Sequence, residues 1–364
     1  MPVAPTSPTP DPAVPATGSG LPWRRRIGPV VALFLLAPWA GEVSWGGFTA
    51  NDYLLVVIFL GPLYGGAALL IRETARRTGG GWPVIVLLAA AFGLIQAGLV
   101  DQALFNRNFL DDTEFAELGT AASATWVPGL GFSAQQAFGY VGGHIALSIC
   151  VPIVIVESFL APGRRRQPWL GRPGLVVAAL LYLLGSLLIF ADAEDGRKGF
   201  QAAPVQVAFV LLLVVALVGT AMLPRWRRHP RPVPARAPHP IWAGLLVFGA
   251  FVSVDLVPGW LGLGVQAVTV GSAATVIVVW SRRTGWGQRH ALAAWSAYLI
   301  AAAAGAYLVP NYAPASPTEA LVGDLAISVI TLALVGGACW RLRGDGRDTG
   351  RDLGHSGRVA GTAG

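Results

Sequence analysis

Long apolar runs separated by short polar segments dominate the sequence. A helix that crosses a membrane needs about 20 mostly apolar residues, with a range of roughly 17–25. Runs of this kind cover residues 27–44, 53–71, 83–104, 137–160, 174–191, 202–223, 240–258, 262–280, 291–309 and 320–340. Strands of a membrane barrel would instead alternate apolar and polar residues over segments of about ten. The pattern therefore predicts an all-α, polytopic bundle of about ten transmembrane helices within residues 23–341.

Both ends of the chain differ from this pattern. Residues 1–22 are rich in proline, alanine, threonine and serine and contain a single charged residue, Asp11. Residues 342–364 are rich in glycine and arginine. Segments of such composition cannot bury enough apolar surface to fold, so we expect two disordered cytoplasmic tails.

The composition excludes an ordinary soluble protein. Hydrophobic residues make up 54% of the 364 residues and charged residues only 12%, with a mean hydropathy of +0.58. Soluble domains carry roughly 25% charged residues. Lys198 is the only lysine beside abundant alanine, glycine and proline, which suggests a GC-rich and hence bacterial coding genome.

The basic residues are distributed unevenly between the two sides of the predicted bundle. With the N-terminus inside, 23 of the 26 arginines and lysines fall on the inner side, and only Arg107, Arg197 and Lys198 fall outside. Cytoplasmic loops carry such an excess, and interfacial tryptophans mark helix ends, where most of the 13 tryptophans stand. We therefore expect a plasma-membrane protein with both termini in the cytoplasm. The net charge of +7 then sets topology, and we expect no nucleic-acid partner.

Three short sequence matches recur in the same order in both halves. The pairs are AGEVSWGG (40–47) with SVDLVPGW (253–260), ARRTGGGW (75–82) with SRRTGWGQ (281–288), and GGHIALSI (142–149) with VGDLAISV (322–329). Each pair keeps its direction through the membrane, as in a parallel repeat about an axis along the membrane normal. The chain would then contain four helices, a connecting hairpin and four more helices. Chance similarity among alanine- and glycine-rich segments is the alternative.

Few ionisable or amide side chains lie within the predicted helices, and these are the candidate functional residues. A charge near the bilayer centre costs roughly 2.5–3.5 kcal/mol, so such residues usually face a bundle interior or a water-filled cavity. The candidates for lining a substrate cavity are His144, Asp324, Gln96, Gln102, Asp255 and Glu157. The candidates for acid–base catalysis are His144, Glu42 and Asp101.

His144 is the only histidine within a predicted helix. It could relay a proton, contact a ligand or bind a metal, or it could be a neutral imidazole that only holds helices together. If the repeat is real, Asp324 is its counterpart, and the two side chains would face each other across the axis. This pair is therefore the first candidate for lining a substrate cavity.

The other candidates lie nearer to helix ends. Gln102 and Asn106 are four residues apart and would share one helical face, either as a polar stripe lining a cavity or as a helix end emerging into the interface. Glu42 stands among Pro38, Gly41 and Gly46, which would open the helix there. Irregular backbone at membrane depth is tolerated where it lines a cavity.

Glu157 lies near the inner end of its helix. We expect it to pair with Arg72 or with Arg164–Arg166, and Arg72 with Glu73 to form a local ion pair. In this interpretation the charges contribute to topology and packing.

No motif indicates a cofactor or metal. Cys150 and Cys339 both fall within predicted helices, and the sequence contains no CxxC, GK[ST], HExxH or GxSxG motif. The expected partners are the lipid bilayer and a small-molecule or lipid substrate.

Four motifs between Pro38 and Pro162 carry a resemblance: YGGAALLIRETARR (64–77), GW (81–82), FGLIQAGL (92–99) and HIALSICVPIVIVE (144–157). On these motifs the segment resembles a group of uncharacterised prokaryotic multi-pass membrane proteins, in which two adjacent glutamates occupy the place of Gln96–Ala97. Paired glutamates also resemble the CAAX-protease-like (CPBP) intramembrane family, whose pattern needs Glu-Glu-x-x-x-Arg and later histidines. This chain has no adjacent glutamates. The resemblance thus implies a relative that lacks the water-activating carboxylates, and it disfavours a peptidase.

Three functions remain open on the sequence. A transporter-like or permease-like protein handling a small solute, ion or lipid is favoured, because such folds bind substrates near the midplane between repeats. A non-catalytic scaffold or partner subunit is the alternative. A membrane enzyme, or a degenerate intramembrane-protease relative, acting on lipid-linked substrates is a second alternative. A polar cavity that touches both His144 and Asp324 would favour transport, and a dry, tightly packed interface there would exclude it. A cluster of His144 with two carboxylates under residues 106–136 would favour an enzyme.

Overall fold

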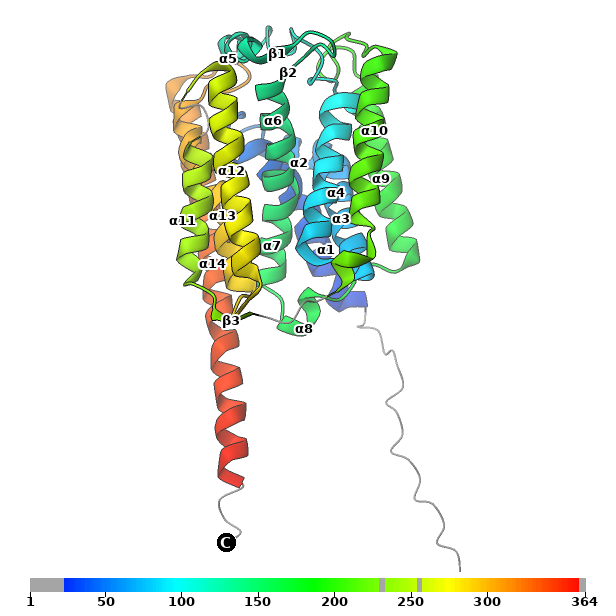
Figure 1. Cartoon of the computed structure of the whole chain (residues 1–364). Coiled ribbons are helices and arrows are strands. Elements are labelled where there is room, and N and C mark those ends of the chain that lie inside the picture. Colours follow the sequence, from blue (N-terminus) through cyan, green and yellow to red (C-terminus); the bar gives the residue numbers. More distant parts are fainter. Residues whose placement is uncertain (1–22, 229–232, 254–256, 360–364) are drawn as a thin grey trace, which may run out of the picture.

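The computed structural model describes residues 23–228, 233–253 and 257–359, which form a bundle of helices standing side by side (Figure 1). Within these ranges, nine helices are long and apolar enough to cross a membrane. The protein is therefore a multi-pass membrane protein. The tail predicted for residues 1–22 lies outside the described residues.

The first four crossings are compound helices, in which α-helical parts continue into wider π-helical turns. In chain order they are α1 (Trp23–Pro38) with η1 (Trp39–Val43); α2 (Tyr53–Leu60), η2 (Gly61–Gly65) and α3 (Gly66–Thr78); α4 (Gly81–Ile95) with η3 (Gln96–Val100); and α6 (Ala134–Gly143), η5 (His144–Cys150) and α7 (Val151–Ser158).

The remaining six helices of the bundle are simpler, and five of them are long enough to cross a membrane. They are α9 (Arg172–Ala191), α10 (Pro204–Ala221), α11 (Pro240–Val252), α12 (Gly259–Ser281), α13 (Gln288–Gly305) and α14 (Pro317–Val359). Each predicted run overlaps one of these helices or compound helices. The run 240–258 corresponds to α11, whose 13 residues span about 20 Å at 1.5 Å per residue, less than the roughly 30 Å hydrocarbon core.

Short elements mark the two sides of the bundle. One side, called here the loop side, carries α5 (Ala116–Ala122), η4 (Ser123–Thr125) and the antiparallel pair β1 (Trp126–Val127) and β2 (Phe132–Ser133), at the top of Figure 1. The other, the arginine side, carries α8 (Pro162–Arg165), η6 (Pro224–Arg227) and the parallel pair β3 (Val233–Arg236) and β4 (Arg283–Thr284). A last 3₁₀ turn, η7 (Ala306–Leu308), ends α13. Helix α14 runs out of the bundle on the arginine side (Figure 1).

Two boundaries differ from the sequence-based expectation. The third crossing ends at Val100 and not at 104, because Asp101 accepts a hydrogen bond from the backbone N–H of Ala103 and Gln102 adopts a positive φ of 59°. Gln102 and Asn106 therefore do not share a helical face. At the C-terminal end, α14 continues to Val359, through most of the segment predicted to be a disordered tail.

The core lies around the compound crossings and α13. More than half of the most apolar window is buried in Tyr53–Thr78, Gly81–Val100, Ala134–Ser158 and Gln288–Leu308, against 11% in α9, α10 and α12. The peripheral helices expose leucine and valine side chains, such as Leu187 and Leu212, to the surroundings. The polar side chains of the interior are therefore carried by a few helices. The four-two-four repeat stays a prediction.

Glycines allow the central helices to approach closely. A Cβ on Gly65 would lie 2.5 Å from the carbonyl oxygen of Phe34 in α1. A Cβ on Gly185 in α9 would lie 2.6 Å from the backbone nitrogen of Leu63. Small residues at helix interfaces let backbones pack against each other in membranes, and here they hold η2 between α1 and α9.

The Gly185→Ala substitution should therefore destabilise the bundle. The added methyl group meets backbone atoms of Leu63, which cannot rotate away, and overpacking typically costs about 1–3 kcal/mol. Gly271→Ala in α12 is the matched control, because a Cβ there meets nothing within 4 Å. Denaturant titrations in detergent should show the loss for Gly185→Ala only; equal midpoints for both variants would contradict the close approach.

Candidate functional site

Seven polar side chains gather within the bundle, and we call them the polar site. They are Glu42, Tyr64, Gln96, Asp101, Tyr140, His144 and Ser148. Asp101 directly follows η3, where the chain leaves the bundle for the loop-side segment 101–133. The site therefore belongs to the half of the bundle nearest to the loop side.

Four π-helical segments deliver most of these side chains. In the described chain, η1 carries Glu42, η2 carries Tyr64, η3 carries Gln96, and η5 carries both His144 and Ser148. Well under 1% of residues in proteins adopt this conformation, and it occurs mostly as single-turn bulges, frequently at functional sites. The convergence of all four on one place is the most unusual feature of the fold.

Proline explains three of the four wide turns. Pro38 directly precedes η1, Pro62 lies within η2, and Pro152 follows η5 at the start of α7. Proline has no N–H for the usual helical bond and its ring crowds the preceding turn, so the hydrogen-bond register shifts nearby. The irregular helix expected around Glu42 is this π-helical turn.

Tyr64 lies between Glu42 and His144 and contacts both. Its hydroxyl donates a short hydrogen bond to Glu42 Oε1, and its ring centroid lies 5.8 Å from that of His144. Phe92 packs edge-on against the same imidazole at 5.4 Å. His144 Nδ1 is 3.1 Å from the hydroxyl of Ser148, one turn further along the helix. Glu42 and His144 thus belong to one cluster, with the buried phenol ring of Tyr64 between them.

Asp101 supplies the second carboxylate. Gln96 Nε2 donates to its Oδ2 at 3.1 Å, and the backbone N–H of Ala103 donates to its Oδ1 at 2.9 Å. Its charge interacts electrostatically with Glu42, Tyr64 and Tyr140. Two acidic groups therefore share one region of the bundle interior.

Two buried polar atoms of the site have no hydrogen-bond partner in the described chain. These are Gln96 Oε1 and the hydroxyl of Tyr140. Buried polar groups are normally paired, and leaving one unpaired costs about 1–3 kcal/mol. Glu42, Asp101 and His144 are themselves partly buried, and the orphaned atoms beside them favour a partner that the chain does not supply.

An aromatic cluster lies between the polar site and the loop side. The rings of Trp45, Phe115 and Tyr312 pack edge to face with centroids 5.0–5.7 Å apart. Backbone hydrogen bonds fix this arrangement: Tyr312 N donates to Gly47 O at 2.8 Å, and Glu114 N donates to Tyr312 O. Tyr312 also interacts electrostatically with Glu42 and Asp101, so the cluster forms a cap over the site.

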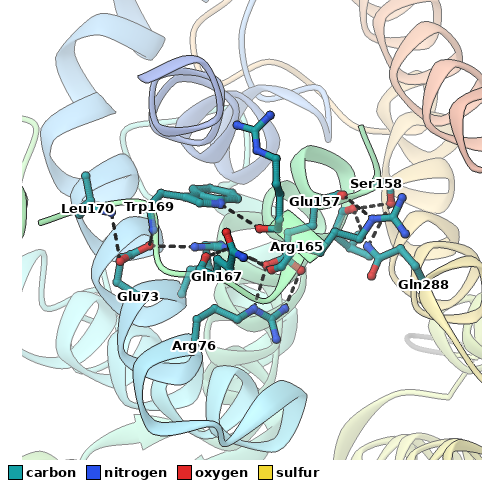
Figure 2. Close-up of polar contacts among 12 residues, drawn as sticks. Glu73, Arg76, Glu157, Ser158, Arg165, Gln167, Trp169, Leu170 and Gln288 are labelled. Atoms are coloured by element: carbon teal, nitrogen blue, oxygen red, sulfur yellow. Dashed lines mark hydrogen bonds and ion pairs between the residues drawn. The ribbon is translucent and has the colours of Figure 1, made fainter. Parts of the chain in front are cut away.

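A second polar cluster lies at the arginine side, and Figure 2 shows its members. We call it the ion-pair network; three of its charged members, Arg72, Glu73 and Glu157, are completely buried. Arg72 donates to Glu157 at 3.0 Å and to Glu73 at 2.8 Å. Arg76 forms a two-pronged pair with Glu157, at 2.9 and 2.5 Å.

Backbone groups complete the network. Arg72 Nη2 donates to the carbonyl oxygens of Arg165 and Gln167, and its guanidinium stacks over the Trp169 ring at 3.2 Å. Glu73 accepts from the backbone N–H groups of Trp169 and Leu170. The predicted pairing of Arg72 with Glu73 and Glu157 is confirmed. The network joins α3 to α7 and to the segment after α8. Its buried charges are paired with opposite charges or with backbone groups, as expected of a structural element.

The other predicted cavity residues lie elsewhere. Gln102 Oε1 accepts the backbone N–H of Ala202 at 2.7 Å and so ties two loop-side segments together. Asp324 lies beside Tyr53, whose hydroxyl donates to the carbonyl oxygen of Gly323. No described contact joins Asp324 to His144. Asp255 falls outside the described residues.

Loop-side segments are also linked by charge. Lys198 forms a short ion pair with Asp112, and this hydrogen bond lowers the pKa of the Asp112 carboxyl. The side chain of Asp112 is 60% exposed, and exposed ion pairs contribute little to stability. Asp112 is therefore a loop-side carboxylate outside the polar site, and its substitution can serve as a control for substitutions of Glu42 and Asp101.

The sequence did not single out Tyr64, Tyr140 or Ser148. Tyrosine and serine in apolar helices are common, so their type carries no signal. The prolines next to η1, η2 and η5 were the usable signal, because each stands within a few residues of a polar side chain that enters the site.

Among the described residues, no group of three or more histidine, cysteine, aspartate or glutamate side chains is arranged to hold a metal ion. No family model, curated protein or solved structure matches the chain.

Proposed function

We propose that the protein is permease-like and binds a small cationic solute, such as an organic amine, at the polar site. The observation that carries this proposal is the convergence of four π-helical turns on two carboxylates and two unpartnered polar atoms inside a membrane bundle. Polar groups in membrane helices usually mark substrate or ion pathways.

The charge of the site favours a cation. No ion pair among the described residues involves Glu42 or Asp101, whereas the buried glutamates of the ion-pair network are all paired. Uncompensated carboxylates in a low-dielectric interior attract protons or cations strongly. Aromatic rings of Tyr64, Phe92 and Tyr140 surround the site, and aromatic faces bind ammonium groups within about 6 Å.

The same chemistry provides coupling to protons. An empty site would hold protons on its carboxyl groups, because two neighbouring carboxylates do not both ionise readily. A bound ammonium group would replace those protons. Glu42, with Tyr64 as hydrogen-bond donor, and Asp101, with Gln96, are the residues that we assign to this exchange.

The packing on the two sides of the polar site supports entry of the solute from the loop side. Half-buried Glu42, Asp101 and His144 lie beneath the aromatic cap, whereas the opposite side is closed by the ion-pair network and by buried Ile149 and Ile153. The arginine excess of cytoplasmic loops makes the arginine side cytoplasmic. The plasma membrane would then hold the protein with the cap outside.

Cysteine labelling tests this orientation. Asn108→Cys and Arg166→Cys place thiols at exposed positions of the loop side and the arginine side, in a chain carrying Cys339→Ser. An impermeant maleimide on intact cells should modify only the thiol at position 108. Labelling of only the thiol at position 166 would reverse the orientation.

Ligand screening tests the function itself. Purified protein in lipid nanodiscs should gain thermal stability with small amines and not with the matched neutral alcohols, since a ligand at 100 times its Kd stabilises by about 2.7 kcal/mol. Equal responses to both series would contradict a cation site.

A membrane enzyme is the second candidate, and one observation favours it. His144 and the Ser148 hydroxyl are 3.1 Å apart, within the range of a base and its nucleophile. His144 bonds to Ser148, and no described hydrogen bond joins it to either carboxylate. Under this alternative, a serine-reactive phosphonate probe would label the wild-type chain and not Ser148→Ala; the permease proposal expects no labelling of Ser148, which is 1% exposed.

A further inference from the structure

The connection between α13 and α14 carries the central ring of the aromatic cap. This connection, called here the strap, comprises residues 309–316 and contains no helix or strand (orange, near α5 at the top of Figure 1). Its Tyr312 ring packs against three other rings at centroid distances of 5.0–5.4 Å, those of Trp45, Phe48 and Phe115. The strap thus brings one aromatic side chain into the cap.

The same tyrosine faces the polar site. Tyr312 interacts electrostatically with Glu42, Asp101 and Tyr140, which belong to three different segments of the polar site. No other residue of the strap has a described interaction with that site. Tyr312 therefore lies between the loop-side surroundings and the two carboxylates.

Only three hydrogen bonds join the strap to other parts of the described chain. Asn311 Nδ2 donates to Gly46 O at 2.9 Å, Tyr312 N donates to Gly47 O at 2.8 Å, and Glu114 N donates to Tyr312 O at 3.3 Å. Each bond ends on a connecting segment and not on a helix. The strap can therefore exchange these bonds for bonds to water without unfolding a helix, and each such bond contributes little net stability.

The two ends of the strap are anchored differently. The most apolar window is 56% buried in Gln288–Leu308, before the strap, and 22% buried in Pro317–Gly344, after it. Near α14 the strap is exposed at Ala313, Pro314 and Ser316. Segments with few buried contacts open locally at the lowest free energy, so residues 313–316 are the natural hinge.

We propose that the strap is the loop-side gate of the polar site, with Tyr312 as its gating side chain. The structure shows the closed state, in which the Tyr312 ring completes the cap. On opening, the three hydrogen bonds are exchanged for bonds to water, the strap hinges at residues 313–316, and Tyr312 leaves the cap. Glu42 and Asp101 then become accessible from the loop side. The identity of the solute rests on the proposed function, whereas the opening of the gate does not.

Thiol accessibility tests the gate without an amine solute. A His144→Cys reporter is placed in the full-length chain carrying Cys339→Ser, in which the remaining Cys150 is buried. The protein in lipid nanodiscs reacts with a trimethylammonium methanethiosulfonate, and intact-mass spectrometry follows the rate. Asn311→Ala should raise the rate about fivefold, the factor expected for one net hydrogen bond.

Substitutions of Tyr312 test the gating side chain itself. Tyr312→Ala removes the ring and should raise the rate by at least tenfold, whereas Tyr312→Phe keeps the ring and should react as slowly as the reporter chain. Gln206→Ala is the matched control, because Gln206 Nε2 also donates to a loop-side carbonyl oxygen at 2.9 Å, that of Leu130, away from the strap. It should leave the rate unchanged.

Two results would overturn the gate. One is an equal rate in the reporter chain and in both the Asn311→Ala and Tyr312→Ala variants, and the other is a rise in Gln206→Ala as large as that in Asn311→Ala. Faster reaction in both strap variants, together with no response of the wild type to amines, would support the gate and reject the amine as its solute.

Discussion

Replacing Glu157 by alanine is expected to destabilise the folded bundle by about 3–5 kcal/mol, the usual cost of removing one partner from a buried ion pair. Glu157 is fully buried and accepts hydrogen bonds from both Arg72 and Arg76. Without it, the fully buried guanidinium of Arg72 keeps only Glu73 as its acidic partner. A denaturant titration in mixed micelles, followed by far-ultraviolet circular dichroism, measures the loss.

A double substitution distinguishes charge from packing. Arg72→Met combined with Glu157→Met removes both charges, and well-packed apolar replacements of buried pairs are often tolerated. The double variant should be more stable than Glu157→Ala alone. Glu114→Ala, at an exposed loop-side position, is the control and should stay within about 0.5 kcal/mol of the wild type. A loss below 1 kcal/mol for Glu157→Ala would show that the network is not structural.

The Glu42→Gln and Asp101→Asn substitutions should weaken binding of a cationic solute by at least tenfold each. Each change keeps the side-chain shape and removes one negative charge, and hydrogen bonds to charged groups contribute about 1.5–3 kcal/mol. Because the two carboxylates share one site, their effects should not be additive. Binding is measured by calorimetry in detergent.

Asp112→Asn is the matched control for these variants. It removes a carboxylate from the loop side without touching the polar site, and its affinity for the solute should equal that of the wild type. Glu42→Gln and Asp101→Asn should also keep wild-type thermal stability or exceed it, because neither carboxylate has an ion-pair partner to lose. Loss of folding in both variants would assign the carboxylates to structure.

Hydropathy predicted the positions of the helices because the bilayer imposes one length on every crossing. It could not place the end of the third crossing, where Asp101 captures the Ala103 N–H and Gln102 turns the chain. Composition predicted disorder after residue 341, but α14 continues to Val359. A helix can extend past the membrane without apolar residues, so composition contains no signal for its end.

The candidate site was predictable only in part. Glu42, Asp101, His144 and Gln96 were candidates on the sequence because charged and amide groups are costly in a membrane. Whether these four side chains lie close together depends on how the π-helical turns rotate each helix. Hydropathy could not predict this, because a shift of hydrogen-bond register leaves the hydropathy pattern unchanged. The predicted pairing of His144 with Asp324 assumed that the repeat governs packing. Tyr64, a residue outside the repeat matches, contacts His144 instead.

The most direct test of the polar site is uptake of a radiolabelled small amine into proteoliposomes. An amine that stabilises the protein should be taken up saturably by the wild type and by Asp112→Asn. The combined Glu42→Gln and Asp101→Asn variant, reconstituted at the same density, should show no saturable uptake. Saturable uptake that persists in the combined variant, or its absence in the wild type, would contradict a cation-binding permease site.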